Sequence, residues 1–152
     1  MSLQKTKSSS APVATREEPK TSNPQPAPKP VIVITSGKGG VGKTLESQVV
    51  QITLQELGHS VVCVDADGSN SSLARQLPEA QLLEGSNGAE LLTSLEKVLL
   101  DECLSGGKSL VVDTGGGFDR TVRAWFASED VTNILHDKHN ASIVRALVML
   151  AG

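Results

Sequence analysis

The sequence has few of the residues that support several common classes of protein. Its 152 residues include two cysteines, one tryptophan, two phenylalanines and no tyrosine. Cys63 and Cys103 each lie in an apolar stretch, which predicts two buried thiols and argues against a disulfide or a cysteine metal site. No apolar run approaches the roughly 18 residues of a membrane-spanning helix, and no apolar signal segment follows the N-terminal lysines. We therefore expect a cytoplasmic protein with no membrane association.

Basic charge is also scarce, except at the N-terminus. The formal net charge is -3, which argues against a large basic surface for nucleic acid. Residues 1–30 hold six of the seven prolines and a net charge of +3, which leaves -6 for residues 31–152. We expect a disordered Ser/Pro/Lys-rich tail over residues 1–30 and a folded domain over residues 31–152. A solubilising tether is the favoured role of this tail, and a basic arm that contacts DNA weakly, or a partner, is the alternative.

A glycine-rich segment separates the apolar run at residues 31–34 from a helical pattern that starts near residue 43. It follows the phosphate-loop pattern G-x-x-x-x-G-K-[ST] in the strand–loop–helix context that this pattern requires. Glycines allow positive φ, and successive N–H groups form an anion nest at the positive end of the helix dipole. The final lysine can reach the β- and γ-phosphates and the threonine can ligate Mg²⁺, so we expect a bound nucleoside triphosphate. The segment is Gly37, Lys38, Gly39, Gly40, Val41, Gly42, Lys43 and Thr44.

A second lysine in this loop indicates which family of phosphate-loop proteins the sequence resembles. The stretch from Lys38 to Thr44 resembles the deviant Walker A signature of the ParA/MinD ATPases. That resemblance implies ATP and Mg²⁺ as ligands, Leu45 beside the nucleotide, and a homodimer that forms on ATP binding. In such a dimer Lys38 would reach phosphates in the partner subunit, where a second cation neutralises charge in phosphoryl transfer. A solvated loop lysine is the alternative.

The rest of the chain alternates strands and helices. Spacings of three and four predict helices over residues 43–57 and 89–104, and short apolar runs predict buried strands at 61–64 and 110–112. This order predicts an α/β fold, a P-loop NTPase with a parallel sheet flanked by helices. A further strand is expected at 131–135, a solvated loop with His136 and His139 after it, and a core helix over 142–150. Members of the family are usually longer, so we expect the domain to be truncated at its C-terminal side.

Two carboxylate motifs follow the second and third predicted strands. Asp113 opens a D-x-x-G segment that resembles switch II, where the carboxylate can hold Mg²⁺ through water and Gly116 can offer its N–H to the γ-phosphate. Asp65-Ala66-Asp67 resembles switch I, which implies that Asp67 orients the attacking water and belongs to the Mg²⁺ site, and that Asp65 supports it. Gly68 departs from the proline of many members, which predicts a looser switch and weaker or partner-dependent hydrolysis.

Smaller cues point within the family. Leu45, Asn70 and Phe118 look closest to ParA-like proteins encoded with plasmid stabilisation and conjugative transfer systems. Three other branches of the family have features that this sequence does not show. Iron–sulfur relatives need cysteines at cluster spacing, tyrosine-kinase relatives carry a tyrosine cluster, and MinD relatives end in a basic amphipathic helix. We expect a slowly hydrolysing, nucleotide-switched ATPase dimer in plasmid partition, stabilisation or transfer. The alternative is a nucleotide-binding adaptor without significant hydrolysis that acts through a protein partner.

Overall fold

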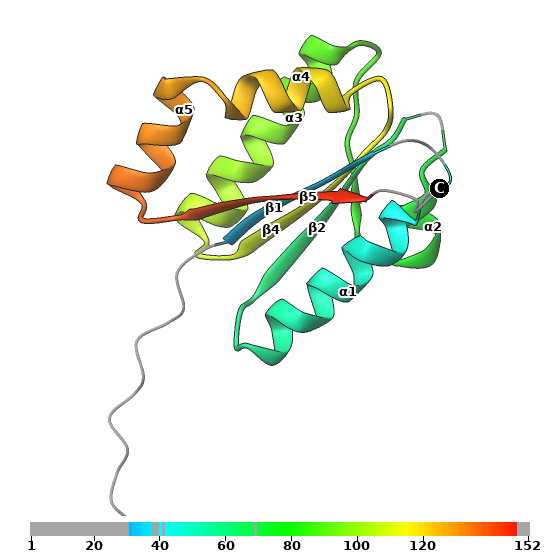
Figure 1. The fold of residues 1–152 in the computed structure, drawn as a ribbon, viewed down its shortest axis with the longest axis horizontal. Helices are drawn as coiled ribbons and strands as arrows, with labels where there is room; N and C mark the ends of the chain where they lie inside the picture. The colour runs from blue at the N-terminus through cyan, green and yellow to red at the C-terminus, as the bar shows by residue number, and fades with distance from the viewer. Residues whose placement is uncertain (1–30, 38–39, 41, 69, 149–152) are drawn as a thin grey trace, which may run out of the picture.

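The described part of the protein is a parallel sheet with helices on both faces (Figure 1). The computed structural model describes residues 31–37, 40, 42–68 and 70–148. Over these residues the strand order is β3-β2-β4-β1-β5, and every pairing is parallel. The expected α/β architecture is therefore confirmed. The strands are β1 (Val31–Gly37), β2 (Val61–Ala66), β3 (Gln81–Leu82), β4 (Ser109–Thr114) and β5 (Ser142–Val148).

The helices of the described residues include the two that were predicted and four further segments. The predicted helix over 43–57 is α1 (Lys43–Glu56), and the one over 89–104 is α3 (Gly88–Val98) continued by the π-helical segment η1 (Leu99–Ser105). The remaining helices are α2 (Ser72–Gln76), α4 (Asp119–Phe126), α5 (Glu129–Asn133) and the π-helical η2 (Ile134–Lys138). None of the helices in these ranges is both long and apolar enough to cross a membrane.

Strand register aligns the functional loops at one edge of the sheet. Thr35 of β1 pairs with Asp113 of β4, and Asp113 pairs with Asp65 of β2. The loops that follow these three strands therefore leave the sheet side by side at its carboxyl edge, where open α/β sheets bind their ligands.

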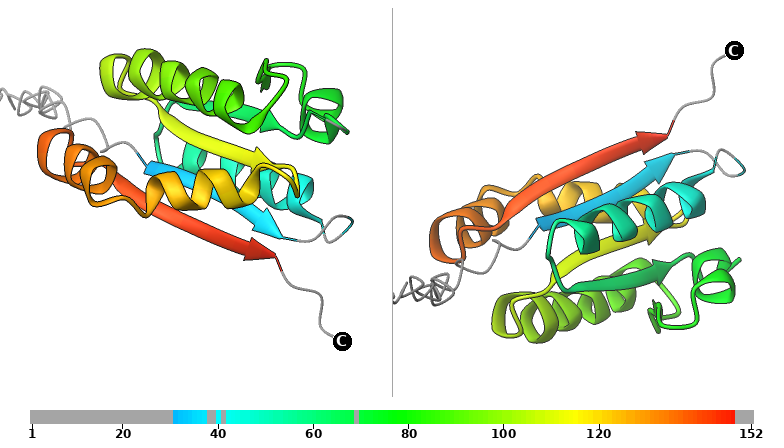
Figure 2. Two further views of the ribbon diagram at one scale, coloured as in Figure 1. Left: turned by 90° about the horizontal axis from the view of Figure 1, so that it is seen from above. Right: turned by 90° about the horizontal axis from the view of Figure 1, so that it is seen from below.

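The core lies on both faces of the sheet. The larger apolar cluster joins β2 and β4 to α3, η1 and α4 through residues such as Val64, Val112, Leu95 and Val122. The smaller cluster, on the α1 face, contains Leu54, Cys63, Leu73 and Val111. Figure 2 shows α1 on the opposite face of the sheet from α4 and α5. Because β2 and β4 are covered on both faces, their apolar runs are continuous and not alternating.

Both cysteines are free and buried, as expected. Burial raises the pKa of the Cys63 thiol and of the Cys103 thiol to about 12 in each case. Neither thiol is therefore a nucleophile or metal ligand at neutral pH.

Two C-terminal predictions are wrong. Residues 131–135, predicted as a strand, lie in α5 and η2, where Glu129 and Asp130 occupy the first turn and favour a helix N-terminus. Residues 142–150 were predicted as a core helix, but 142–148 form β5, paired with β1 along its full length. A short apolar run does not by itself distinguish a buried helix from a strand, and here pairing with β1 decides the outcome.

Three further features compare with the predictions: the two C-terminal histidines, helix α4 and the N-terminal residues. His136 and His139 are exposed as expected, although His136 lies in η2 and not in a loop. Helix α4 was not predicted. Its signal is Val122 and Phe126, which lie four residues apart and face the core, and an ion pair of 2.9 Å joins the exposed Arg123 to the largely covered Asp119. Residues 1–30 lie outside the described residues, so the disordered tail remains a prediction.

Candidate nucleotide site

The loops after β1, β2 and β4 enclose a pocket of about 190 Å³. It brings together parts of the sequence that were predicted separately: the phosphate loop, the Asp65-Ala66-Asp67 motif and the D-x-x-G motif. Side chains from α2, which sequence reasoning did not single out, complete the wall. The lining residues are Gly40, Gly42, Lys43, Thr44, Asp67, Asn70, Ser72, Gln76 and Asp113.

The phosphate loop has the backbone that its glycines allow. Gly40 and Gly42 have φ of +78° and +95°, in the left-handed region where only glycine is unstrained. Gly42 caps α1, and its carbonyl accepts the N–H of Glu46 at 3.0 Å. The following Lys43 is buried, on the sheet side of α1.

Other residues of the predicted loop lie differently. Gly37 ends β1, whereas Lys38, Gly39 and Val41 lie outside the described residues, so the role of Lys38 is not tested. Leu45 is exposed and is not among the residues that line the pocket, and its place beside the nucleotide stays a prediction.

Thr44 and Asp113 form the polar centre of the pocket. The Thr44 hydroxyl donates to Oδ2 of Asp113 at 3.0 Å, while Oδ1 of Asp113 is buried with no hydrogen-bond partner among the described residues. Desolvation by burial raises the pKa of Asp113, the hydrogen bond from Thr44 lowers it, and Asp65 raises it further. The folded protein thus holds a carboxylate whose charge is only partly compensated.

This arrangement fits Mg²⁺. The unpartnered Oδ1, the Thr44 hydroxyl and the nearby Asp67 are hard oxygen donors, which Mg²⁺ prefers. Over the described ranges, three or more His, Cys, Asp or Glu side chains do not cluster as a metal cage would require. Mg²⁺ ordinarily takes its remaining ligands from water and phosphate, so a site with few protein ligands suits this ion.

Asp65 and Asp67 have different surroundings. Asp65 is fully buried; its Oδ1 accepts the N–H of Asp67 and its Oδ2 accepts the N–H of Ala74, both at 2.9 Å. Asp65 therefore fixes the backbone of the loop that carries Asp67 and anchors α2 to β2. Asp67 is half-buried and lies against Gly115, where an added Cβ would come within 2.7 Å of Asp67 Oδ1. Gly116, which follows, is exposed.

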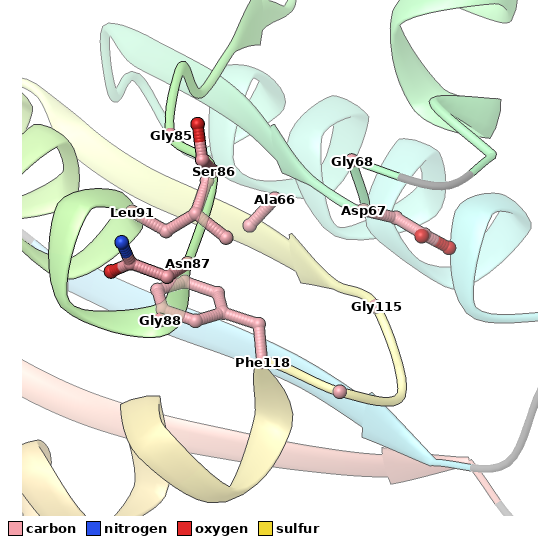
Figure 3. Close-up of a pocket in the computed structure, with 11 residues that line it drawn as sticks. Ala66, Asp67, Gly68, Gly85, Ser86, Asn87, Gly88, Leu91, Gly115 and Phe118 are labelled. Atoms are coloured by element: carbon pink, nitrogen blue, oxygen red, sulfur yellow. The ribbon is translucent and has the colours of Figure 1, made fainter.

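A second pocket of about 390 Å³, whose lining residues Figure 3 shows, shares Asp67 with the first. Leu91 and Phe118 supply apolar side chains, and the loop before α3 supplies Ser86 and Asn87. Asn87 caps α3 by accepting the N–H groups of Ala89 and Glu90, each at 3.0 Å. Asp67 borders both pockets, so its position can respond to either one.

Sequence comparison agrees with this geometry. Residues 27–95 match the ParA family model, described as the NUBPL iron-transfer P-loop NTPase. The septum site-determining protein MinD of Synechocystis sp. is 41% identical over 83 residues, which are 55% of this chain and 28% of that protein. These residues are therefore similar to a P-loop NTPase domain of the ParA/MinD type. The chloroplastic minD homolog of Arabidopsis thaliana is 57% identical over 37 residues, 24% of this chain and 11% of that protein.

Structural comparison supports the α/β fold. The signal recognition particle receptor FtsY of Elizabethkingia anophelis has a TM-score of 0.50 at 17% identity, covering 76% of this chain and 41% of that one. The chain thus spans a minor part of the relatives that it matches. The septum-site names of the sequence relatives support the ParA/MinD type but give no link to plasmid systems.

Proposed function

We propose that this protein is a Mg²⁺-dependent ATPase of ParA/MinD type that hydrolyses slowly and acts as a nucleotide switch. The observation that carries the proposal is the unpartnered Oδ1 of Asp113, next to the Thr44 hydroxyl in a pocket walled by Lys43 and Asp67. Phosphoryl transfer relies on positioning and on charge compensation, and this set of residues can supply both.

Each residue has a distinct role in this proposal. Lys43 and the loop N–H groups bind the phosphates, and Thr44 and Asp113 hold Mg²⁺. Asp67 orients the attacking water and belongs to the Mg²⁺ site. Mg²⁺, when bound, neutralises charge that develops on the phosphate oxygens. The exposed backbone N–H of Gly116 lies on the switch II loop and senses the γ-phosphate.

ATP-dependent homodimerisation completes the switch. Lys38 reaches the phosphates of the partner subunit, and the γ-phosphate holds both switch loops in the dimeric state. The output is a conformational state read by a protein partner in the cytoplasm. The names of the MinD relatives support a role in septum placement, and the cues at Leu45, Asn70 and Phe118 support plasmid partition, stabilisation or conjugative transfer.

Three substitutions test the enzyme. Lys43→Ala should abolish ATP binding, Asp67→Ala should spare binding and lower phosphate release, and Lys38→Ala should spare binding and remove ATP-dependent dimerisation. The measurements are calorimetric ATP titration, steady-state phosphate release and sedimentation with ATP. If Lys38→Ala dimerised normally with ATP, the proposal that Lys38 contacts phosphates in the partner subunit would be refuted.

The second candidate is a nucleotide-binding adaptor without significant hydrolysis. Gly68 next to Asp67 is exposed, with open space where a side chain would lie, so no side chain at this position restrains Asp67 by packing. Phosphate release no faster than that of Lys43→Ala would support the adaptor. A rate that Asp67→Ala lowers would support the ATPase.

Any DNA binding should come from the basic tail. Residues 31–152 carry a net charge of -6, so the folded part has little to neutralise phosphates with. Mobility shifts of the full chain and of a shortened protein that starts at Val31, each with and without ATP, test this. Weak, salt-sensitive binding by the full chain alone is expected; equal ATP-dependent binding by both would place a DNA site on the ATPase fold.

A further inference from the structure

Helix α1 presents three apolar side chains to solvent, while three of the four side chains that it buries are polar or charged. Leu45, Val49 and Ile52 have exposed fractions of 64%, 53% and 54%; together they are called the α1 stripe here. The buried side of the same helix is formed by Lys43, Ser47, Gln51 and Leu54. A surface helix ordinarily has the opposite polarity, apolar toward the core and polar toward water.

The α1 stripe has the spacing of a helix–helix seam. Its members are separated by four and then three residues, which aligns them within roughly 60° of each other at about 100° per residue. Ser47 lies on the far side of the helix, at roughly 160° from each of the two nearest members and about 140° from Ile52. The stripe is therefore a continuous apolar line that points away from the rest of the molecule.

We propose that the α1 stripe binds the α1 stripe of a second copy of this chain, with the two helices antiparallel and no nucleotide required. A twofold axis at Val49 sets Val49 against Val49 of the partner subunit and Leu45 near Ile52 of the partner subunit. The stripe is self-complementary in this orientation, as a twofold interface requires.

Charge selects the antiparallel orientation. Glu56 is exposed just beyond the C-terminal end of the stripe, whereas Glu46 is half-buried with its Oε2 withdrawn from solvent. In a parallel pair Glu56 would face its own copy, whereas in the antiparallel pair Glu56 approaches the N-terminus of the partner's α1. That end carries the positive pole of the helix dipole, so it attracts the Glu56 carboxylate. The two helix dipoles are antiparallel, which is also favourable.

The same charges disfavour other occupants. From Thr44 to Glu56 the helix has two acidic residues and no lysine or arginine. Nucleic acid and anionic lipid both require basic residues at the contact, which this surface does not offer. Lys43 is buried on the side of α1 opposite the stripe.

Sedimentation of the full chain without nucleotide tests the proposal. The wild-type protein should show a concentration-dependent monomer–dimer equilibrium, and Val49→Asp should weaken the dimer at least tenfold. The matched control is Leu100→Asp on η1, because Leu100 is equally exposed at 55% but lies on the other face of the sheet. A wild-type monomer at all concentrations, or equal loss of the dimer in Leu100→Asp, would overturn the proposal.

Cross-linking tests the orientation. Cys63 and Cys103 are buried with thiol pKa values of about 12, so an introduced surface cysteine is the reactive one. Under diamide, Val49→Cys should form a covalent dimer, and a mixture of Leu45→Cys and Ile52→Cys should cross-link more than either variant alone. Gln55→Cys, exposed on another side of α1, is the control. Cross-linking of Gln55→Cys to the extent of Val49→Cys would refute a specific interface.

A comparison with the ATP-dependent dimer separates this proposal from the proposed function. Lys38→Ala should keep the nucleotide-free dimer and lose only the response to ATP, while Val49→Asp should lose the first and keep the second. Loss of both in Lys38→Ala would mean that the α1 stripe is not an independent interface. Failure of ATP to bind at all would contradict the proposed function and leave the α1 result to stand by itself.

Discussion

Asp113 is the residue at which the folded protein carries an unfavourable charge. Its pKa is raised in the folded state, chiefly by burial, so the folded state binds its proton more tightly than the unfolded state. The stability that this residue contributes is complete below its ordinary value of 3.8 and is lost as pH rises through the raised value. In the absence of Mg²⁺, Asp113 therefore destabilises the protein at neutral pH.

Asp113→Asn should remove this penalty. The variant should melt at a higher temperature than the wild type in metal-free buffer near pH 8, by about 2–4 °C for each kcal/mol recovered, and the difference should shrink toward pH 4. Mg²⁺ with ATP should stabilise the wild type and not the variant. Melting curves across this pH range measure both effects; a pH-independent difference would show that charge is not its cause.

Gly115 keeps the space that Asp67 occupies. An added Cβ would lie 2.7 Å from Asp67 Oδ1 and 3.0 Å from its Cα, so Gly115→Ala must displace Asp67. A shift of about 1 Å can cost on the order of 100-fold in rate, so phosphate release should fall by ten- to 100-fold or so while ATP affinity is kept. Gly117→Ala, which meets nothing within 4 Å, is the control. Equal rates for the two variants would separate Gly115 from catalysis.

At the residue scale, the chemistry was largely predictable and the contacts were not. Lys43, Thr44 and Asp113 were identified because each lies in a motif whose chemistry fixes the residue type. The contact between Gly115 and Asp67 joins two loops from different strands, and no local pattern specifies it. Ser72 and Gln76 of α2 line the nucleotide pocket and were not predicted, for the same reason.

At the scale of elements, periodicity located α1 but not the face that it buries. Leu45, Val49 and Ile52 have helical spacing, and so do the polar residues that the sheet covers. Apolar spacing identifies a core-facing side only where the solvent side is polar. The β5 error has a related cause, because a run of apolar residues is a strand or a helix depending on the neighbour that it meets.

The start of α3 depends on one reciprocal cap. Asn87 accepts two N–H groups of the first turn, and Glu90 accepts from the N–H of Ser86 and from Asn87 Nδ2. Asn87→Ala should lower the free energy of unfolding by about 1 kcal/mol, measured by urea denaturation. Asn133→Ala provides the control, since Asn133 makes no side-chain cap bond. A loss no greater than that of the control would contradict a capping role.

At the scale of the whole molecule, the two cysteines report on both faces of the sheet. Cys103 lies in the larger apolar cluster and Cys63 in the smaller one. Because β2 and β4 contribute to both clusters, we expect the faces to open together and both thiols to react with an alkylating reagent at one rate. Mass spectrometry of labelled peptides measures the two rates, and Mg²⁺ with ATP should slow both. Early labelling of one cysteine alone would show that the faces open separately.

The position of β1 in the sheet also determines when the sheet can form. β1 lies between β4 and β5, and its first pairings are Ile32 with Leu110 and Val31 with Ser142, separations of 78 and 111 residues. Such distant pairings make folding slow, because the intervening chain must be ordered before they can form. At a synthesis rate of roughly 5–20 residues per second, about 4 to 20 seconds pass between the synthesis of β1 and that of the two strands with which it pairs. The strand that precedes the phosphate loop is therefore made before both of the strands that flank it, and it pairs only after they have been made.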